Sequence, residues 1–224
     1  IKEHFQESLA DIKHLLDNLF VSGINHHVYH GTAYSPAEAA WPGWLFYAST
    51  QFNPQNPIWH DFGTLNKYVT RCQSILQAGE PDNDVLVYFP IHDILHDPTR
   101  GLAAHLSIEG KWLEPLAALP AFRHLWKHGY AFDYISDRQV TEIQFKDKIL
   151  KTSGSQHKAI VVPPCEFMPT ETLAKLTELS KQGAHIIFLS PIPRDVPGLA
   201  DLEQRQAQFK SLATNIQPCT EIDT

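Results

Sequence analysis

Three histidines lie within the short run His26-His27-Val28-Tyr29-His30, and imidazole side chains could bind a metal ion or a polar ligand. We expect residues 24–31 to form a β-strand, on which His26 and His27 would point to opposite faces. The spacing from His27 to His30 also misses the two-residue period of one strand face. One ion could not reach these rings without a bulge, so the pattern predicts no metal site and suggests no cofactor.

The segment from Thr32 to about Asn56 is an unusually long and aromatic loop. Connections between elements usually have about four to six residues, and longer ones are often functional. The aromatic residues of this loop are Tyr34, Trp41, Trp44, Phe46 and Tyr47. We therefore expect the loop to form part of a binding surface.

Composition excludes several classes of protein. The chain has 224 residues, 43% of them apolar, enough to bury a core. Its formal charge of −7 and dispersed lysines and arginines argue against nucleic-acid binding, and no apolar run is long enough for a membrane span. Three cysteines without a CxxC spacing give neither a disulfide framework nor a zinc site. Because it begins at Ile1 without a signal-peptide pattern, we expect the chain to be an excised segment.

The first 80 residues should position the histidines and the aromatic loop. Apolar residues at spacings of three and four predict a helix over residues 1–20, ending before Gly23. A second helix is expected from Asn56-Pro57 to about Gln77, with Cys72 as part of its packing face. A turn-rich, charged stretch at 79–84 then predicts a domain boundary, giving domains of residues 1–80 and 81–224.

Residues 81–224 alternate short apolar runs with helical patterns. The runs at 85–89, 131–135, 159–162 and 186–189 are typical of strands buried on both faces of a parallel sheet. Helices are expected at about 111–128, 170–182 and 200–213, and a small hairpin within 139–151. This alternation predicts an α/β fold with a doubly wound sheet.

Several short motifs occur in one order along residues 23–77: Gly23-Ile24-Asn25, Tyr29-His30-Gly31-Thr32, Tyr34-Ser35-Pro36, Trp41-Pro42-Gly43-Trp44, and Trp59 followed by Leu65-Asn66, Tyr68, Arg71 and Gln73. In these motifs the segment resembles the end of the catalytic domain of glycoside hydrolase family 106, the large bacterial α-L-rhamnosidases. The resemblance implies that residues 1–80 are the terminal βα segment of a (β/α)8 barrel. Residues 84–215 look like the domain that follows, a flavodoxin-like fold similar to class I glutamine amidotransferases and to the middle domain of family 42 β-galactosidases.

Substrate meets such a barrel at the carboxyl ends of its strands. A sugar needs hydrogen-bonding groups and apolar rings, so the expected substrate-binding residues are His30, Tyr34, Trp41 and Trp44. For both tryptophans, packing within the loop is the favoured interpretation over stacking on a sugar. His30 could instead hydrogen-bond neighbouring backbone.

No catalytic pair is evident. Glycoside hydrolysis requires two facing carboxyl groups, and the barrel segment offers Glu38 and Asp61, neither at the end of a strand. The family uses two glutamates, which we expect upstream of this segment.

The second domain offers little for catalysis. A thiol nucleophile there would be Cys165, but Pro163-Pro164 precede it and no glycine flanks it, which disfavours a nucleophile elbow. His92 and His96, with Asp93 and Asp97, follow the first strand. They are interpreted as hydrogen-bonded loop residues rather than as part of the wall of an active site.

Three hypotheses follow. The first is a glycosidase fragment acting on rhamnose-containing or related glycans, inactive alone, from a periplasmic or extracellular enzyme that could bind calcium. The second is a stand-alone glycan-binding or assembly module, and the third is an enzyme that uses Cys165. We expect a carbohydrate partner, no nucleic acid and no membrane. Apolar faces on Ile24 and Val28 predict a homodimer or packing against other domains.

Overall fold

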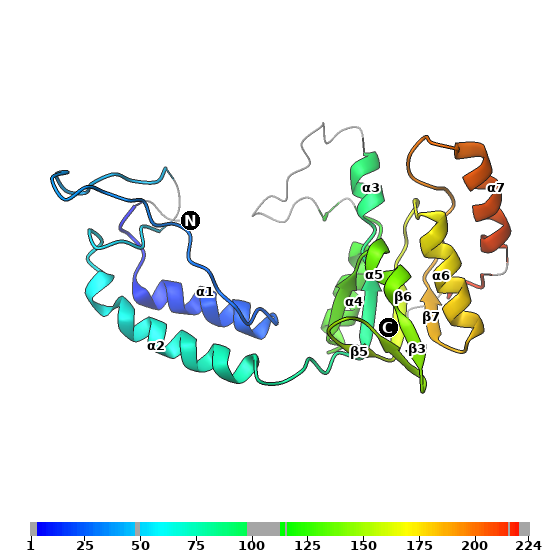
Figure 1. Ribbon diagram of the computed structural model, residues 1–224, viewed down its shortest axis with the longest axis horizontal. Helices are drawn as coiled ribbons and strands as arrows, with labels where there is room; N and C mark the ends of the chain where they lie inside the picture. The colour runs from blue at the N-terminus through cyan, green and yellow to red at the C-terminus, as the bar shows by residue number, and fades with distance from the viewer. Residues whose placement is uncertain (1–3, 48–49, 98–112, 115, 215, 220–224) are drawn as a thin grey trace. The chain divides into compact units, whose positions relative to one another are not determined.

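The computed structural model describes residues 4–47, 50–97, 113–114, 116–214 and 216–219. By its internal contacts the chain divides into two compact units, Ile1–Glu80 and Pro81–Thr224. Figure 1 shows the elements of each unit, with labels on the helices and on several of the strands. None of the described helices is long and apolar enough to cross a membrane.

The first unit is built on two helices, α1 (Leu9–Val21) and α2 (Trp59–Leu76). Both expected helices are present. The first begins later than expected, because Ser8 and Asp11 form a reciprocal capping box at its start. The apolar side chains of both helices pack around one aromatic ring of the loop, forming a core of Ile12, Leu16, Phe52, Phe62, Leu65 and Val69.

The expected strand over residues 24–31 is wrong, because the structure shows extended backbone there without a strand. A strand exists only through ladder hydrogen bonds to a neighbour, and among the described residues helix α2 supplies side-chain partners instead. The amide of His27 donates to Oε1 of Gln73 at 2.8 Å, and Nε2 of Gln77 donates to the Asn25 carbonyl at 2.5 Å. The segment is therefore held along a helix by two glutamines.

The second unit contains a four-stranded parallel sheet in the order β2-β1-β6-β7. Its strands are β1 (Val85–Tyr88), β2 (Phe132–Ile135), β6 (Ala159–Val162) and β7 (His185–Phe188). All four strands expected from the apolar runs are present. The α/β fold with a parallel sheet is thus confirmed.

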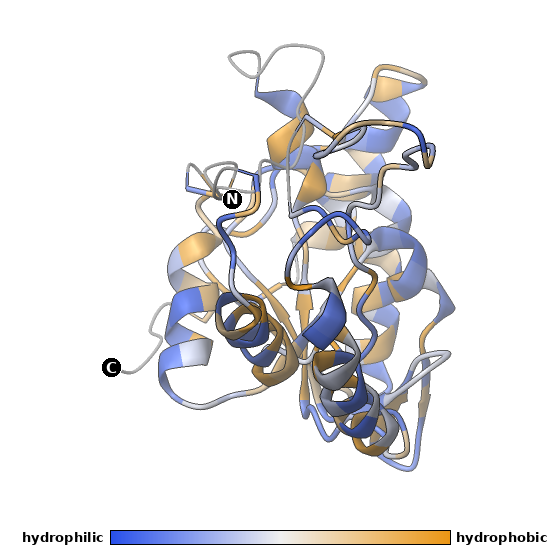
Figure 2. Ribbon diagram, turned by 90° about the vertical axis from the view of Figure 1, so that its left-hand side faces the viewer, coloured by the Kyte–Doolittle hydropathy of each residue, from blue (hydrophilic) through white to orange (hydrophobic). Residues whose placement is uncertain are grey.

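Helices cover both faces of this sheet. Side chains alternate along β1, so that Leu86 and Tyr88 face α6 (Thr170–Lys181) and α7 (Leu202–Ala213), whereas Val85 and Val87 face α4 (Leu119–Lys127). Figure 2 shows that the strands are mostly hydrophobic and that the helices around them carry both hydrophobic and hydrophilic residues. Part of the helix expected at 111–128, residues 111, 112 and 115, lies outside the described residues. Helix α4 itself begins at Leu119.

The remaining elements are two short helices, α3 (Ile91–His96) and α5 (Asp137–Glu142), and an antiparallel sheet of β3 (Gln144–Lys146), β4 (Ile149–Lys151) and β5 (Gln156–His157). The hairpin expected within 139–151 is present only from residue 144. Residues 137–142 are helical because Ser136 and Gln139 form a second capping box, which places Val140 in the core.

Candidate functional site

The four residues expected to bind substrate all lie at the surface of the first unit. Tyr34, Trp41 and Trp44 are 79%, 68% and 61% exposed, and His30 is also exposed. Among the described residues, no hydrogen bond or ring contact joins any two of the four. These four separate side chains, on the aromatic loop and just before it, are called the rim.

Each rim residue has its own support. The His30 ring lies edge-on to Phe46, with centroids 4.9 Å apart. The indole N–H of Trp41 donates to the Gln55 carbonyl at 3.1 Å, and its ring lies 5.5 Å from that of Phe5. Trp41 therefore packs against a neighbouring ring and also remains exposed. This lies between the two interpretations from the sequence, packing within the loop and stacking on a sugar.

Trp44 is positioned through its backbone. Its amide donates to Oγ of Ser35 at 3.1 Å, which joins it to the neighbour of Tyr34. The close approach requires glycine at the preceding position: Gly43 has φ of +77°, and a Cβ there would lie 2.3 Å from the Ser35 hydroxyl oxygen. Because only the Trp44 backbone is bonded, its side chain can be changed without loss of this support.

A buried layer of amides beneath the rim was not foreseen from the sequence. Gln51 and Asn53 are at most 1% exposed and Asn56 is 3% exposed, although all three are polar. Gln51 donates from Nε2 to the Phe46 carbonyl at 3.1 Å, and Asn56 donates from Nδ2 to the Gln51 carbonyl at 2.8 Å. Burying amides is costly unless they are bonded, so these bonds fix the backbone below the aromatic residues. The only sequence signal was the amide-rich run from Gln51 to Asn56.

The histidine run does not assemble a metal site. Among the described residues, no group of three or more His, Cys, Asp or Glu side chains is placed to hold an ion. His27 packs edge-on against Phe20, with centroids 4.4 Å apart. Burial, and then the neighbouring His26, lower the pKa of His27. His27 thus belongs to the packing of α1 and the extended segment.

The two carboxylates singled out from the sequence of the first unit are both exposed and lie on different elements. Glu38 is in a turn of the loop, and Asp61 is in the first turn of α2, where a negative charge is favourable. Neither has a hydrogen-bond network that would hold it in a reactive geometry. The described part of this unit therefore shows no acid and base pair.

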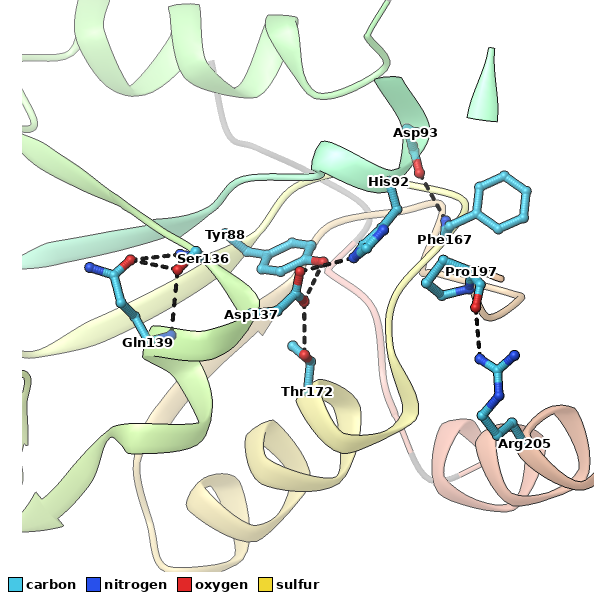
Figure 3. A network of polar contacts seen from close by, with 10 residues as sticks. All are labelled: Tyr88, His92, Asp93, Ser136, Asp137, Gln139, Phe167, Thr172, Pro197 and Arg205. Atoms are coloured by element: carbon cyan, nitrogen blue, oxygen red, sulfur yellow. Dashed lines mark hydrogen bonds and ion pairs between the residues drawn. The ribbon is translucent and has the colours of Figure 1, made fainter. Parts of the chain in front are cut away.

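In the second unit, Asp137 is the centre of a polar network (Figure 3). Its carboxylate accepts from the Tyr88 hydroxyl at 2.9 Å and from the Thr172 hydroxyl at 2.8 Å, and it lies 3.0 Å from Nε2 of His92. Burial alone would raise the pKa of Asp137, but the three hydrogen bonds outweigh it and the pKa is lowered. The network joins β1, α3, α5 and α6.

Asp93 also joins two segments through hydrogen bonds. Its two carboxylate oxygens accept from the amides of Glu166 and Phe167, each at 2.9 Å. Figure 3 shows the bond from Phe167. Burial raises the pKa of Asp93, and these two amides partly oppose that rise. His92 and Asp93 are thus hydrogen-bonded, as interpreted from the sequence, although they lie on helix α3 and not on a loop.

Cys165 is not arranged as a nucleophile. It is 3% exposed, and burial, followed by the charges of Asp93 and Asp137, raises the pKa of its thiol far above the ordinary range. A thiolate is required for attack, and this environment keeps the thiol protonated. The structure therefore argues against the hypothesis of an enzyme that uses Cys165.

The chain is similar to known proteins over most of its length. Residues 1–221 match the family described as α-L-rhamnosidase, glycoside hydrolase family 106. A protein of Formosa agariphila named as a β-glucuronidase is 28% identical over 211 residues. The match covers 93% of this chain but only 16% of that relative, so the chain spans a small part of the relative's length.

Among solved structures, a family 42 β-galactosidase, Gan42B, has a TM-score of 0.38 at 15% identity, over 62% of this chain and 18% of that one. A catalytic mutant of Gan42B from G. stearothermophilus has a TM-score of 0.40 at 14% identity, over 64% of this chain and 19% of that one.

Proposed function

This chain belongs to glycoside hydrolase family 106, the α-L-rhamnosidase family, and we propose that it supplies part of the sugar-binding surface of a larger glycosidase. In this proposal residues 1–80 are the terminal βα segment of the catalytic (β/α)8 barrel, and residues 24–31 form their strand only by pairing with neighbouring strands of the complete barrel. Residues 81–224 are an accessory α/β domain. The glutamates that act as acid and base lie elsewhere in the enzyme.

The observation that carries the proposal is an exposed aromatic surface on a fixed backbone. Aromatic side chains usually bury most of their area, so several strongly exposed ones on a single loop indicate a binding surface. Here Tyr34, Trp41, Trp44 and Tyr47 are each more than 60% exposed. The buried Gln51 and Asn56 amides hold the loop beneath them, so this surface is prepared before any ligand binds.

A sugar ring matches this surface in its chemistry. Its C–H face can stack on the indole of Trp41 or Trp44, while its hydroxyls bond to the His30 imidazole and the Tyr34 phenol. Such contacts bind and orient the substrate and exclude water. They do not transfer protons to the glycosidic oxygen, a step that requires a carboxyl pair.

The substrate proposed is a glycan containing L-rhamnose, in keeping with the family description. The relative from Formosa agariphila carries the name of a β-glucuronidase, so a uronic acid is the natural competitor in an assay. A periplasmic or extracellular location suits the degradation of such polymers.

The second unit is proposed to resemble class I glutamine amidotransferases without their chemistry. Taken in chain order, the strands of its parallel sheet are arranged 2-1-3-4, the beginning of the flavodoxin-like order. The buried, protonated Cys165 supports a non-catalytic role. In this proposal the second unit packs against other parts of the enzyme and binds ligands, and it carries out no reaction.

The proposal is tested with p-nitrophenyl α-L-rhamnoside and p-nitrophenyl β-D-glucuronide. We expect the protein encoded by the complete gene to hydrolyse the rhamnoside, and residues 1–224 alone to hydrolyse neither substrate. Turnover by residues 1–224 alone would contradict the proposal and direct attention to Glu38 and Asp61. Preference of the complete protein for the glucuronide would overturn the substrate while leaving the sugar-binding rim in place.

A further inference from the structure

A cavity of about 530 Å³ opens at the carboxyl edge of the parallel sheet in the second unit. It is formed by the segments that follow three strands: Asp93 and His96 after β1, Glu166 and Phe167 after β6, and Arg194 after β7. From β1 the chain passes to β2 on one side, and from β6 it passes to β7 on the other. The cavity therefore lies where strand order reverses, the position at which open α/β sheets bind ligands.

The walls of this cavity are fixed by backbone hydrogen bonds. Asp93 holds the amides of Glu166 and Phe167, as described above. The amide of Asp195 donates to the Glu166 carbonyl at 3.2 Å, and the amide of Met168 donates to the Asp195 carbonyl at 3.0 Å. Segments from three different strands are thus joined into one preformed wall, as expected of a small-molecule site.

The lining combines an aromatic surface with charges of both signs. The rings of His96 and Phe167 lie 4.1 Å apart, and Phe167 is 8% exposed. Beside them Nη2 of Arg194 forms an ion pair with Glu166 at 2.5 Å, and the Asp97 carboxylate also lines the cavity. A ligand would meet an apolar ring, a guanidinium donor and carboxylate acceptors.

This combination selects the class of ligand. A phosphate or other strong anion would face the carboxyl groups of Asp93, Asp97 and Glu166 against one guanidinium. The described residues place no group of three or more His, Cys, Asp or Glu side chains to hold a metal ion, and an organic cation would compete with the Arg194 guanidinium for Glu166. A neutral polyol suits both, because each hydroxyl can donate to a carboxylate and accept from the guanidinium while its C–H face covers the ring. The volume is also within the range of about 300–1,000 Å³ usual for small-molecule sites.

We propose that this cavity binds a neutral monosaccharide-sized sugar, as a second carbohydrate site made of other residues than the rim. The proposal does not rest on the function proposed for the rim. No reaction is assigned to the cavity. The site would let the accessory domain hold a glycan that the enzyme also cleaves, or one of its products.

The test is a ligand-observed NMR titration of residues 1–224 with D-glucose, D-galactose and L-rhamnose as probes. A monosaccharide has about twelve non-hydrogen atoms, and at the efficiency usual for larger ligands its Kd is on the order of 2 mM. Ala117 is exposed and lines the cavity, so Ala117→Trp should fill the site and weaken binding at least tenfold. Ala207→Trp, at an exposed position of α7, is the matched control and should leave Kd unchanged.

Two further variants keep the result decisive. Arg194→Ala removes an exposed guanidinium without touching the core, and it should weaken sugar binding several-fold even if Ala117→Trp folds poorly. Trp44→Ala separates the two sites, because any part of the sugar binding that belongs to the rim should weaken with this variant while the part that belongs to the cavity remains. The proposal is overturned if no probe binds saturably, if Ala117→Trp and Ala207→Trp behave alike, or if binding is lost only with Trp44→Ala. It is also overturned if inorganic phosphate or putrescine binds in place of the sugars.

Discussion

Replacement of Trp44 by alanine removes an exposed aromatic side chain of the rim and leaves the backbone hydrogen bond to Ser35 in place. A tryptophan side chain can bury up to about 250 Å², and Trp44 is 61% exposed, which leaves roughly 150 Å² accessible. If a sugar covers one face, about 75 Å² is buried, worth about 2 kcal/mol at 25 cal/mol per Å². Trp44→Ala should therefore lower affinity for substrate roughly 25-fold.

The assay compares kcat and KM for p-nitrophenyl α-L-rhamnoside in the protein encoded by the complete gene. Trp126→Ala is the matched control, because Trp126 is 66% exposed on helix α4 of the other unit. We expect kcat/KM to fall for Trp44→Ala and to stay unchanged for Trp126→Ala, with equal unfolding temperatures. The reasoning is refuted if both variants change kcat/KM by less than twofold.

Three further predictions concern stability and reactivity. Hydrogen bonds lower the pKa of Asp137, so its carboxylate contributes stability above the unfolded pKa of about 3.9, and this contribution is lost as pH falls through the folded pKa. In urea unfolding, the free energy of unfolding of Asp137→Asn should therefore fall less below about pH 4 than that of the wild type. Gly43→Ala should destabilise the first unit by more than about 1 kcal/mol in thermal unfolding, whereas Gly63→Ala, with open space at its Cβ, should stabilise it. Iodoacetamide should label the exposed Cys219 in the native protein and label Cys165 only after unfolding, and native labelling at Cys165 would contradict the account of its burial.

The strands of the parallel sheet could be predicted because the signal for each is local. Continuous apolar runs such as Val85–Tyr88 must be buried on both faces, whatever their neighbours are. The extended segment at 24–31 misled the prediction for the opposite reason. Its β-branched and aromatic residues fit a strand, but pairing depends on a partner, and here Gln73 of α2 and Gln77 just after that helix take that role.

The sequence also carries the start signals of two helices, one of which the prediction over residues 1–20 places too early and one of which it misses. A capping box joins two residues three positions apart, as in Ser8 with Asp11 and Ser136 with Gln139. In each pair the helix begins at the residue directly after the serine. At Ser136 this local signal converts the start of an expected hairpin into helix α5.

The interactions that shape the candidate sites were beyond sequence reasoning. Asp93 and Phe167 are separated by 74 positions, and nothing in either segment indicates that one caps the other. Gln51 lies in a polar run that is typical of a surface loop, yet it is fully buried. Its burial follows from the way the loop folds over Phe52, which is a tertiary property.

The central claim is that the rim faces a carbohydrate. A crystal structure of the protein encoded by the complete gene, with a rhamnose-containing ligand bound in its catalytic barrel, tests this most directly. We predict ring contacts of about 4 Å between the sugar and Trp41 or Trp44, and a hydrogen bond from the sugar to His30 or Tyr34. A ligand bound far from these four side chains, with the rim open to bulk solvent, would contradict the account.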